Sequence, residues 1–139
     1  MRADLRPGND VSWSVFVGGA YEPNEIAFLA ATLKPGITLV DVGANEGLFT
    51  LIGALRVGDT GHVFAFEPSS REFERLKANI DLNRRLDNVE PLRFALYNHS
   101  GPANLSCAEF GPRDFFQGRG SAVAFHPYWR REVVGYKRS

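Results

Sequence analysis

Apolar residues alternate with other residues from Val11 to Val17, and this period of two predicts a β-strand that ends at Gly18. The pattern then changes to a helical period. Pro23 suits the first turn of a helix, and an apolar stripe recurs at positions 26, 29, 30 and 33. Residues 37–42 are almost continuously apolar, which is typical of a strand in the buried centre of a parallel sheet.

Helical and strand-like patterns keep alternating through the middle of the chain. They predict a helix from residue 48, a strand over 62–66, a helix over 70–86, and two more strands over 91–96 and 103–108. Strands separated by helices indicate an α/β, Rossmann-like fold with a mostly parallel sheet and flanking helices. From residue 109 the periodicity fades, and we expect an irregular arm or loop over 109–139.

The junction between the strand at 37–42 and the next helix carries the strongest functional signal. It places Gly43 and Gly47 in the turn and Asp41 just before it. Glycine permits positive φ and leaves no Cβ in the path of a ligand. A helix that begins there adds unpaired N–H groups and the positive end of its dipole. The turn is therefore a candidate ligand site.

The spacing within this turn separates two classes of ligand. Dinucleotide sites usually have the pattern G-x-G-x-x-G. Here Asn45 stands in place of the middle glycine, and Glu46 adds a negative charge that we expect to repel a pyrophosphate. A zwitterionic amino-acid tail suits this turn better, because Asp41 can face its ammonium group. These features favour S-adenosylmethionine over a dinucleotide.

The second strand also ends in an acid. Glu67 follows the strand at 62–66, where a carboxylate can accept hydrogen bonds from both hydroxyls of a ribose. Pro68 turns the chain away from the sheet, and Ser69 begins a capping-box pattern that starts the next helix. We expect the end of the third strand to approach the adenine ring, which makes Phe94, Ala95 and Leu96 candidate contacts through backbone or packing.

The segments LVDVGANEGLFT and VFAFEPSSREFERLKANIDLN, with GAYEPNE upstream and FALYNHSG downstream, resemble the FkbM family of S-adenosylmethionine-dependent methyltransferases. The resemblance implies a class I methyltransferase fold and methyl transfer to an oxygen, often a hydroxyl of a sugar or small natural product. It also implies residues at the methionine end, at the ribose and beside the adenosine of the cofactor. With Glu22 reaching the cofactor from the preceding segment, these are Asp41, Gly43, Ala44, Asn45, Gly47, Glu67, Pro68 and Ser69.

One departure from the family pattern concerns the C-terminal part. Family members carry a further strand that ends in a motif of the type K-I-D-V-E-G beside the transferred methyl, and this chain has nothing similar. We therefore expect one S-adenosylmethionine-binding domain over residues 1–139 that is incomplete at its C-terminus. Whether this chain is active by itself stays open. The aromatic residues of the 109–139 arm are candidates for a contact between two copies.

Composition narrows the partners further. The 16 basic and 16 acidic residues balance, so we expect no nucleic-acid partner. No apolar run is long enough to span a bilayer, and the N-terminus lacks the apolar core of a signal peptide, so we expect no membrane partner and a cytoplasmic location. Metal-ligand spacing is absent from the sequence, so no metal is expected. The general base stays unknown.

Two other functions remain open from the sequence. An oxidoreductase-like nucleotide-binding domain would share the α/β core, and a non-catalytic module could keep the methyltransferase fold for binding or assembly. The favoured acceptor is a hydroxyl on a sugar or a small natural product.

Overall fold

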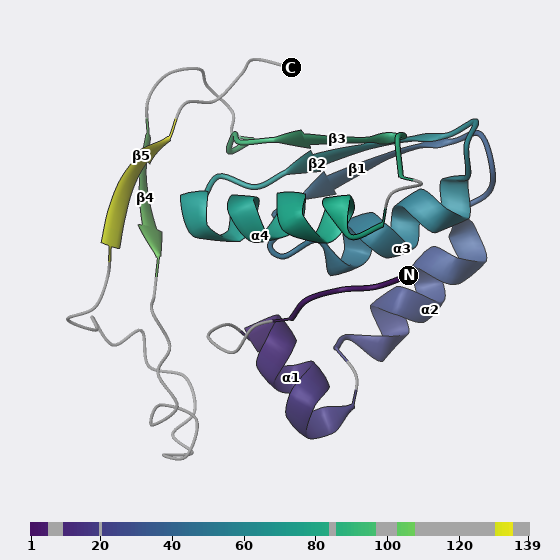
Figure 1. The fold of residues 1–139 in the computed structure, drawn as a ribbon, viewed down its shortest axis with the longest axis horizontal. Coiled ribbons are helices and arrows are strands. Elements are labelled where there is room, and N and C mark those ends of the chain that lie inside the picture. The colour runs from purple at the N-terminus through teal and green to yellow at the C-terminus, as the bar shows by residue number, and fades with distance from the viewer. Residues whose placement is uncertain (6–9, 20, 84–85, 97–102, 108–129, 135–139) are drawn as a thin grey trace.

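The computed structural model describes residues 1–5, 10–19, 21–83, 86–96, 103–107 and 130–134 (Figure 1). Helices and strands follow in the order α1 (Asp10–Gly18), α2 (Pro23–Thr32), β1 (Thr38–Val42), α3 (Leu48–Val57), β2 (His62–Phe66), α4 (Ser70–Asp81), β3 (Val89–Leu92), β4 (Ala103–Cys107) and β5 (Arg130–Val134). The predicted α/β class is confirmed.

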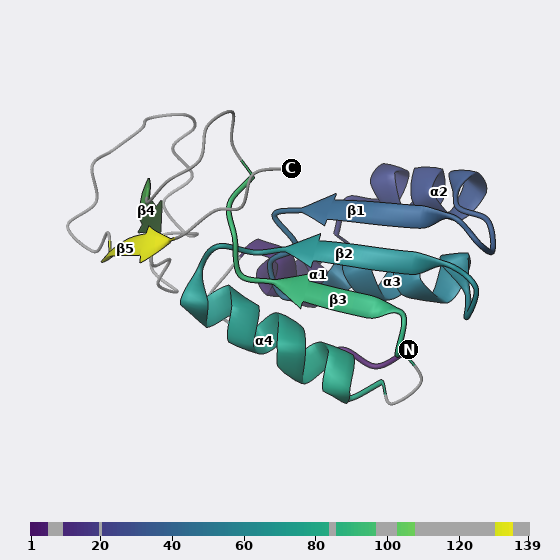
Figure 2. The same ribbon diagram turned by 90° about the horizontal axis from the view of Figure 1, so that it is seen from above.

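Strands β1, β2 and β3 form a parallel sheet in that order (Figure 2). Asp41 pairs with Ala65 and Val42 with Phe66 across β1 and β2, and Phe66 pairs with Leu92 of β3. Because parallel strands end at the same edge of a sheet, the residues that follow β1 and β2 come together there. Strands β4 and β5 form a separate antiparallel pair.

The helices α3 and α4 lie on one face of the parallel sheet, and α2 packs against α3 (Figures 1 and 2). The core lies between these layers and consists of buried side chains from α3, α4 and β2, namely Leu51, Ala54, Val57, Val63, Ala65 and Leu76. Burying a large side chain of this kind stabilises the fold by about 1.5–3 kcal/mol. On the opposite face no described helix covers β1, where Val40 and Val42 are 52% and 60% exposed.

The strand predicted from Val11 to Val17 is wrong, because this segment is helix α1. In a strand these two valines would face the same side, but Val11 is buried and Val17 is 68% exposed. A strand needs a neighbour to take up its backbone N–H and C=O groups, whereas a helix satisfies them internally. A short alternation of serines with apolar residues therefore does not exclude a helix.

Two predicted boundaries also shift. Helix α4 ends at Asp81 rather than near residue 86, and Leu86 belongs to the core without being part of that helix. Strand β3 begins at Val89, because the parallel register starts with the pair Val63–Val89. Pro91 is tolerated inside β3 because β3 is an edge strand of the described sheet.

The arm predicted over 109–139 lies mostly outside the described residues, which include only β5 from it. Strand β4 agrees with the strand expected over 103–108. Among the described helices, none combines the length and the apolar character that a membrane span requires.

Candidate functional site

The loop that connects β1 to α3, from Gly43 to Gly47, is called the glycine loop here. Three of its residues have positive φ: 81° at Gly43, 52° at Asn45 and 92° at Gly47. Asparagine tolerates this region better than most residues with a side chain, which explains how it can stand between the glycines. The N–H groups of Gly43 and Ala44 donate to the carbonyl oxygen of Phe66, at 2.8 and 2.9 Å. The loop is thereby held against the end of β2.

The two glycines of the loop serve different purposes. A side chain at Gly47 would place its Cβ 2.6 Å from Cδ1 of Leu76, because α4 packs directly against the backbone there. A Cβ at Gly43 would meet nothing within 4 Å. The Gly43 end of the loop is therefore the side that a ligand can approach closely.

Glu67 holds the glycine loop from the end of β2. Its Oε2 accepts a hydrogen bond from the N–H of Asn45, and its Oε1 accepts one from the N–H of Ser69, both at 2.8 Å. The residue is only 7% exposed. Burial raises the pKa of its carboxyl above the ordinary 4.5, the two N–H bonds oppose that rise, and the nearby charges of Glu72 and Asp41 add to it.

Asp41 lies at the end of β1 and takes a different partner. The hydroxyl of Thr50 donates to its Oδ2 at 2.5 Å. Burial raises the pKa of Asp41 above 3.8, and the hydrogen bonds from Thr50 work against that rise. Sequence reasoning missed Thr50, although it lies in the first turn of α3 and could have been identified as a polar residue on the buried side of that helix.

The predicted role of Glu46 is wrong. Its side chain is fully buried, and its Oε1 is 2.6 Å from Nη1 of Arg75 on α4. The charge that was expected to repel a pyrophosphate is therefore neutralised inside the protein. The side chain of Arg75 in this pair is 20% exposed. The preference for S-adenosylmethionine then depends on the loop spacing and the strand-end acids.

Ser69 occupies the N-cap position of α4, as the capping-box pattern predicts. The side-chain bonds differ from that pattern, because Ser69 makes no side-chain bond to the helix N–H groups. Its hydroxyl instead donates to Oε2 of Glu72 at 2.5 Å, and Glu72 Oε1 accepts from Nε of Arg71 at 2.7 Å. The cap is therefore a buried side-chain pair.

The structure brings most, but not all, of the predicted cofactor residues together. Hydrogen bonds to Glu67 and to Phe66 join the loop, which follows β1, to the end of β2. The side chain of Ala44 packs into the core, so only its backbone faces the loop. Glu22 lies exposed before α2 with φ at 43°, and half-buried Ala95 follows β3, both outside this hydrogen-bond network.

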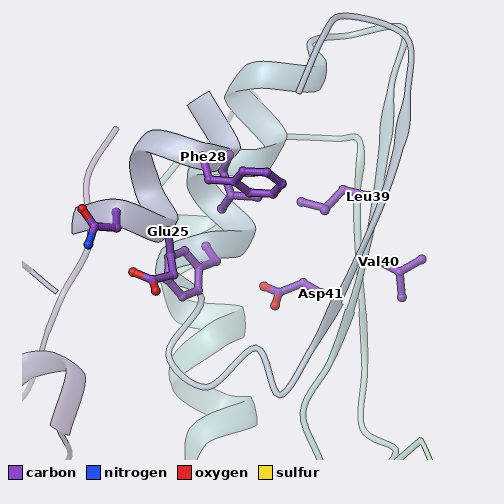
Figure 3. A pocket seen from close by; sticks show the side chains of 8 residues that line it. Glu25, Phe28, Leu39, Val40 and Asp41 are labelled. Carbon is purple, nitrogen blue, oxygen red and sulfur yellow. The ribbon is translucent and has the colours of Figure 1, made fainter. Parts of the chain in front are cut away.

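A cavity of about 390 Å³ opens beside β1 (Figure 3). Such a volume falls within the range of about 300–1,000 Å³ that small-molecule sites occupy. The wall is mostly apolar and also carries the carboxylates of Glu25 on α2 and Asp41 on β1. Its lining comes from α2, β1 and the first turn of α3: Asn24, Glu25, Phe28, Leu29, Leu39, Val40, Asp41 and Phe49. Of the predicted cofactor residues, Asp41 borders this cavity.

The chain is similar to a curated protein over part of its length. A segment of 48 residues is 44% identical to the ribosomal RNA large subunit methyltransferase E of Nitrosomonas eutropha and covers 34% of this chain and 23% of that protein. The match thus spans less than a quarter of the curated relative. No family model matches the chain, so membership of the FkbM family stays a prediction.

Solved structures give the fold. A protein assigned as an rRNA methylase from Clostridium thermocellum superposes with a TM-score of 0.50 at 22% identity, over 52% of this chain and 39% of that chain. An S-adenosylmethionine-dependent O-methyltransferase from Thermotoga maritima gives a TM-score of 0.48 at 21% identity, over 61% and 34%. The chain has the fold of a class I methyltransferase.

The expectation of no nucleic-acid partner is wrong. It rested on the balance of charges over the whole chain, whereas the matching relative is a ribosomal RNA methyltransferase. The net charge of a whole chain does not describe the electrostatic potential of one surface. A net charge of zero therefore does not exclude contact with RNA.

Proposed function

We propose that this chain binds S-adenosylmethionine at the glycine loop as part of a methyltransferase that acts on RNA. The observation that carries the proposal is the arrangement of Asp41 and Glu67 at neighbouring strand ends. The loop between them is open at Gly43 and is held by Glu67 through the N–H of Asn45. The sequence identity of 44% to a ribosomal RNA methyltransferase over 48 residues supports methyl transfer to RNA as the reaction class.

The residues present fit such a cofactor. When bound, S-adenosylmethionine supplies an electrophilic methyl group on a sulfonium. A carboxylate has about four acceptor positions, so Glu67 can accept from ribose hydroxyls beyond its two N–H partners. Asp41 borders the cavity, and its carboxylate would face the ammonium group of the cofactor. Roles for Glu22, Pro68, Ser69 and Ala95 beside the cofactor remain part of the proposal.

The acceptor class follows from the relative rather than from the sequence pattern. The sequence favoured a hydroxyl on a sugar or a small natural product, and the matching relative is instead a ribosomal RNA methyltransferase. An RNA acceptor offers ribose 2′-hydroxyls as well as base atoms. Transfer to an oxygen thus remains compatible with RNA, and the methylated atom is an outcome for experiment.

Calorimetry tests the cofactor site. We expect S-adenosylhomocysteine to bind in the micromolar range and NAD not to bind. For variants that lose a carboxylate at Asp41 or Glu67, Asp59→Asn is the control. Asp59 is an exposed residue in the turn between α3 and β2, at the opposite end of β2 from Glu67. Binding of NAD without S-adenosylhomocysteine would indicate an oxidoreductase-like domain instead.

Transfer of a labelled methyl group tests the acceptor. The protein is incubated with labelled S-adenosylmethionine and, in separate reactions, ribosomal RNA, a protein mixture and free sugars. We expect label in RNA, and digestion to nucleosides then shows whether ribose or base carries it. Label in protein or sugar alone would refute the RNA acceptor. Cofactor binding with no transfer from the full-length protein would indicate a non-catalytic module.

A further inference from the structure

The N-terminal segment, residues 1–5, lies along α4 in the opposite direction to the helix (Figures 1 and 2). Two asparagines one helical turn apart hold its backbone. Oδ1 of Asn83 accepts from the N–H of Arg2 at 2.8 Å, and Nδ2 of Asn83 donates to the carbonyl of Arg2 at 2.6 Å. Asn79 binds Asp4 in the same way, at 2.6 and 3.4 Å. These bonds recognise backbone, so they require an extended chain rather than particular side chains.

Asn79 differs from Asn83 in what else it touches. Its Nδ2 also donates to the carbonyl oxygen of Glu46 in the glycine loop, at 2.8 Å. Asn79 is only 1% exposed, so its carboxamide has no solvent to replace a lost partner. One buried side chain therefore binds two segments that are far apart in the sequence.

Glu46 is accordingly held twice by α4. Arg75 pairs with its carboxylate and Asn79, one helical turn further on, binds its carbonyl. Its neighbours in the loop are also restrained, Asn45 by Glu67 and Gly47 by contact with Leu76. The conformation of the loop thus depends on α4, and through Asn79 on the N-terminal segment.

We propose that Asn79 is a positioning residue for the glycine loop, and that the N-terminal segment, by binding Asn79, keeps the loop in the shape that receives the cofactor. The inference rests on the proposed cofactor site. Its physical basis is the geometry of one amide: Oδ1 on Asp4 fixes the orientation in which Nδ2 reaches Glu46. When the segment leaves, Oδ1 of Asn79 loses its donor and the amide is no longer held toward the loop.

The two asparagines provide a matched pair of variants. Asn79→Asp keeps the oxygen that Asp4 needs but replaces the donor to Glu46 by an acceptor, whereas Asn83→Asp makes the same change without touching the loop. We expect Asn79→Asp to speed hydrogen exchange of peptides containing residues 43–48 by at least about fivefold, and Asn83→Asp by less than about twofold. Peptides from β2 should exchange as in wild type in both variants.

Affinity for S-adenosylhomocysteine is measured on the same proteins. We expect a loss of at least about fivefold in Asn79→Asp and little change in Asn83→Asp. Hydrogen exchange is measured without ligand, so it tests the coupling even when no cofactor binds. Failure of wild type to bind S-adenosylhomocysteine would count against the proposed function, whereas equal exchange in the two variants would overturn the role of Asn79.

A second pair covers the case in which Asn79→Asp does not fold. Asp4→Pro removes the N–H that Asn79 accepts, and Asp4→Ala keeps it while removing the same side chain. We expect faster loop exchange in Asp4→Pro than in Asp4→Ala. Identical loop exchange in these two variants would show that the N-terminal segment does not position the loop.

Discussion

The two acidic strand ends of this protein are held by different sets of hydrogen-bond donors. Glu67 places its carboxylate between two backbone N–H groups, those of Asn45 and Ser69. Asp41 accepts from the side-chain hydroxyl of Thr50 and borders a cavity of about 390 Å³. Glu67 is thus part of the structure of the glycine loop as well as a candidate ligand group. Asp41 contributes its charge to the wall of the cavity.

The difference teaches how a substitution at each acid is to be interpreted. Loss of cofactor binding after a change at Glu67 combines a lost contact with a distorted loop. The same loss after a change at Asp41 reports mainly on charge and hydrogen bonding at the cavity. Each experiment at these positions therefore needs a stability measurement beside the affinity measurement.

The largest effect is expected for Glu67→Ala. The buried N–H of Ser69 and the half-buried N–H of Asn45 lose their acceptor, so the free energy of unfolding should fall by about 2–4 kcal/mol, measured by urea denaturation. Affinity for S-adenosylhomocysteine should weaken by about 1–3 kcal/mol. Glu67→Gln is the matched control, because it keeps one acceptor oxygen and should lose less of both. Unchanged affinity in a folded Glu67→Ala protein would refute the ribose role.

The two loop glycines should separate stability from binding. Gly47→Ala creates a contact with Leu76 on top of a positive φ, and we expect a loss of about 2–3 kcal/mol of stability. Gly43→Ala has only the positive φ to accommodate, about 1 kcal/mol, but it fills the open side of the loop. Thermal denaturation and calorimetry together test this. Tighter binding in Gly43→Ala than in Gly47→Ala would place the ligand elsewhere.

Thr50→Val tests the partner of Asp41. The variant keeps the shape of the side chain but removes the hydroxyl donor, so stability should fall by about 1–2 kcal/mol. Because the hydroxyl of Thr50 lowers the pKa of Asp41, its loss should raise that pKa further, while the backbone hydrogen bond from residue 50 remains. Carboxyl carbon shifts in an NMR titration measure it. A lower pKa in Thr50→Val would contradict the assignment.

The smallest effect concerns the dependence of stability on pH. A carboxyl whose folded pKa is raised binds more protons in the folded chain, so its contribution favours folding below pH 3.8 and is lost as the pH rises through the folded pKa. Asp41→Asn removes the titrating group, so this loss of stability no longer occurs, and the amide keeps an oxygen that can accept from Thr50. We expect the stability of the variant relative to wild type to increase from about pH 3.5 to about pH 7. Denaturation curves for Asp59→Asn serve as the control, and parallel curves for both variants would contradict the prediction.

Much of the fold could be predicted from the sequence because its signals are local. The apolar run over 37–42 and the strand over 62–66 were identified by period and composition, and β1 and β2 match them closely. Placing Asp41 and Glu67 near one edge required only that the strands be parallel. The segment from Val11 to Val17 failed because its period suits a strand but nothing in it shows whether a partner strand exists.

By itself, the sequence determined the strand–loop–helix order, the positive-φ positions at Gly43 and Gly47, and the acids at the strand ends. Only the tertiary structure decided that Glu46 pairs with Arg75 across 29 positions, and that Asn79 binds Glu46 across 33 and Asp4 across 75. The physical reason is range: dihedral preference and helical or strand periodicity act over a few neighbouring residues. Burial of a charge or an amide depends on which distant segment the packed core brings against it.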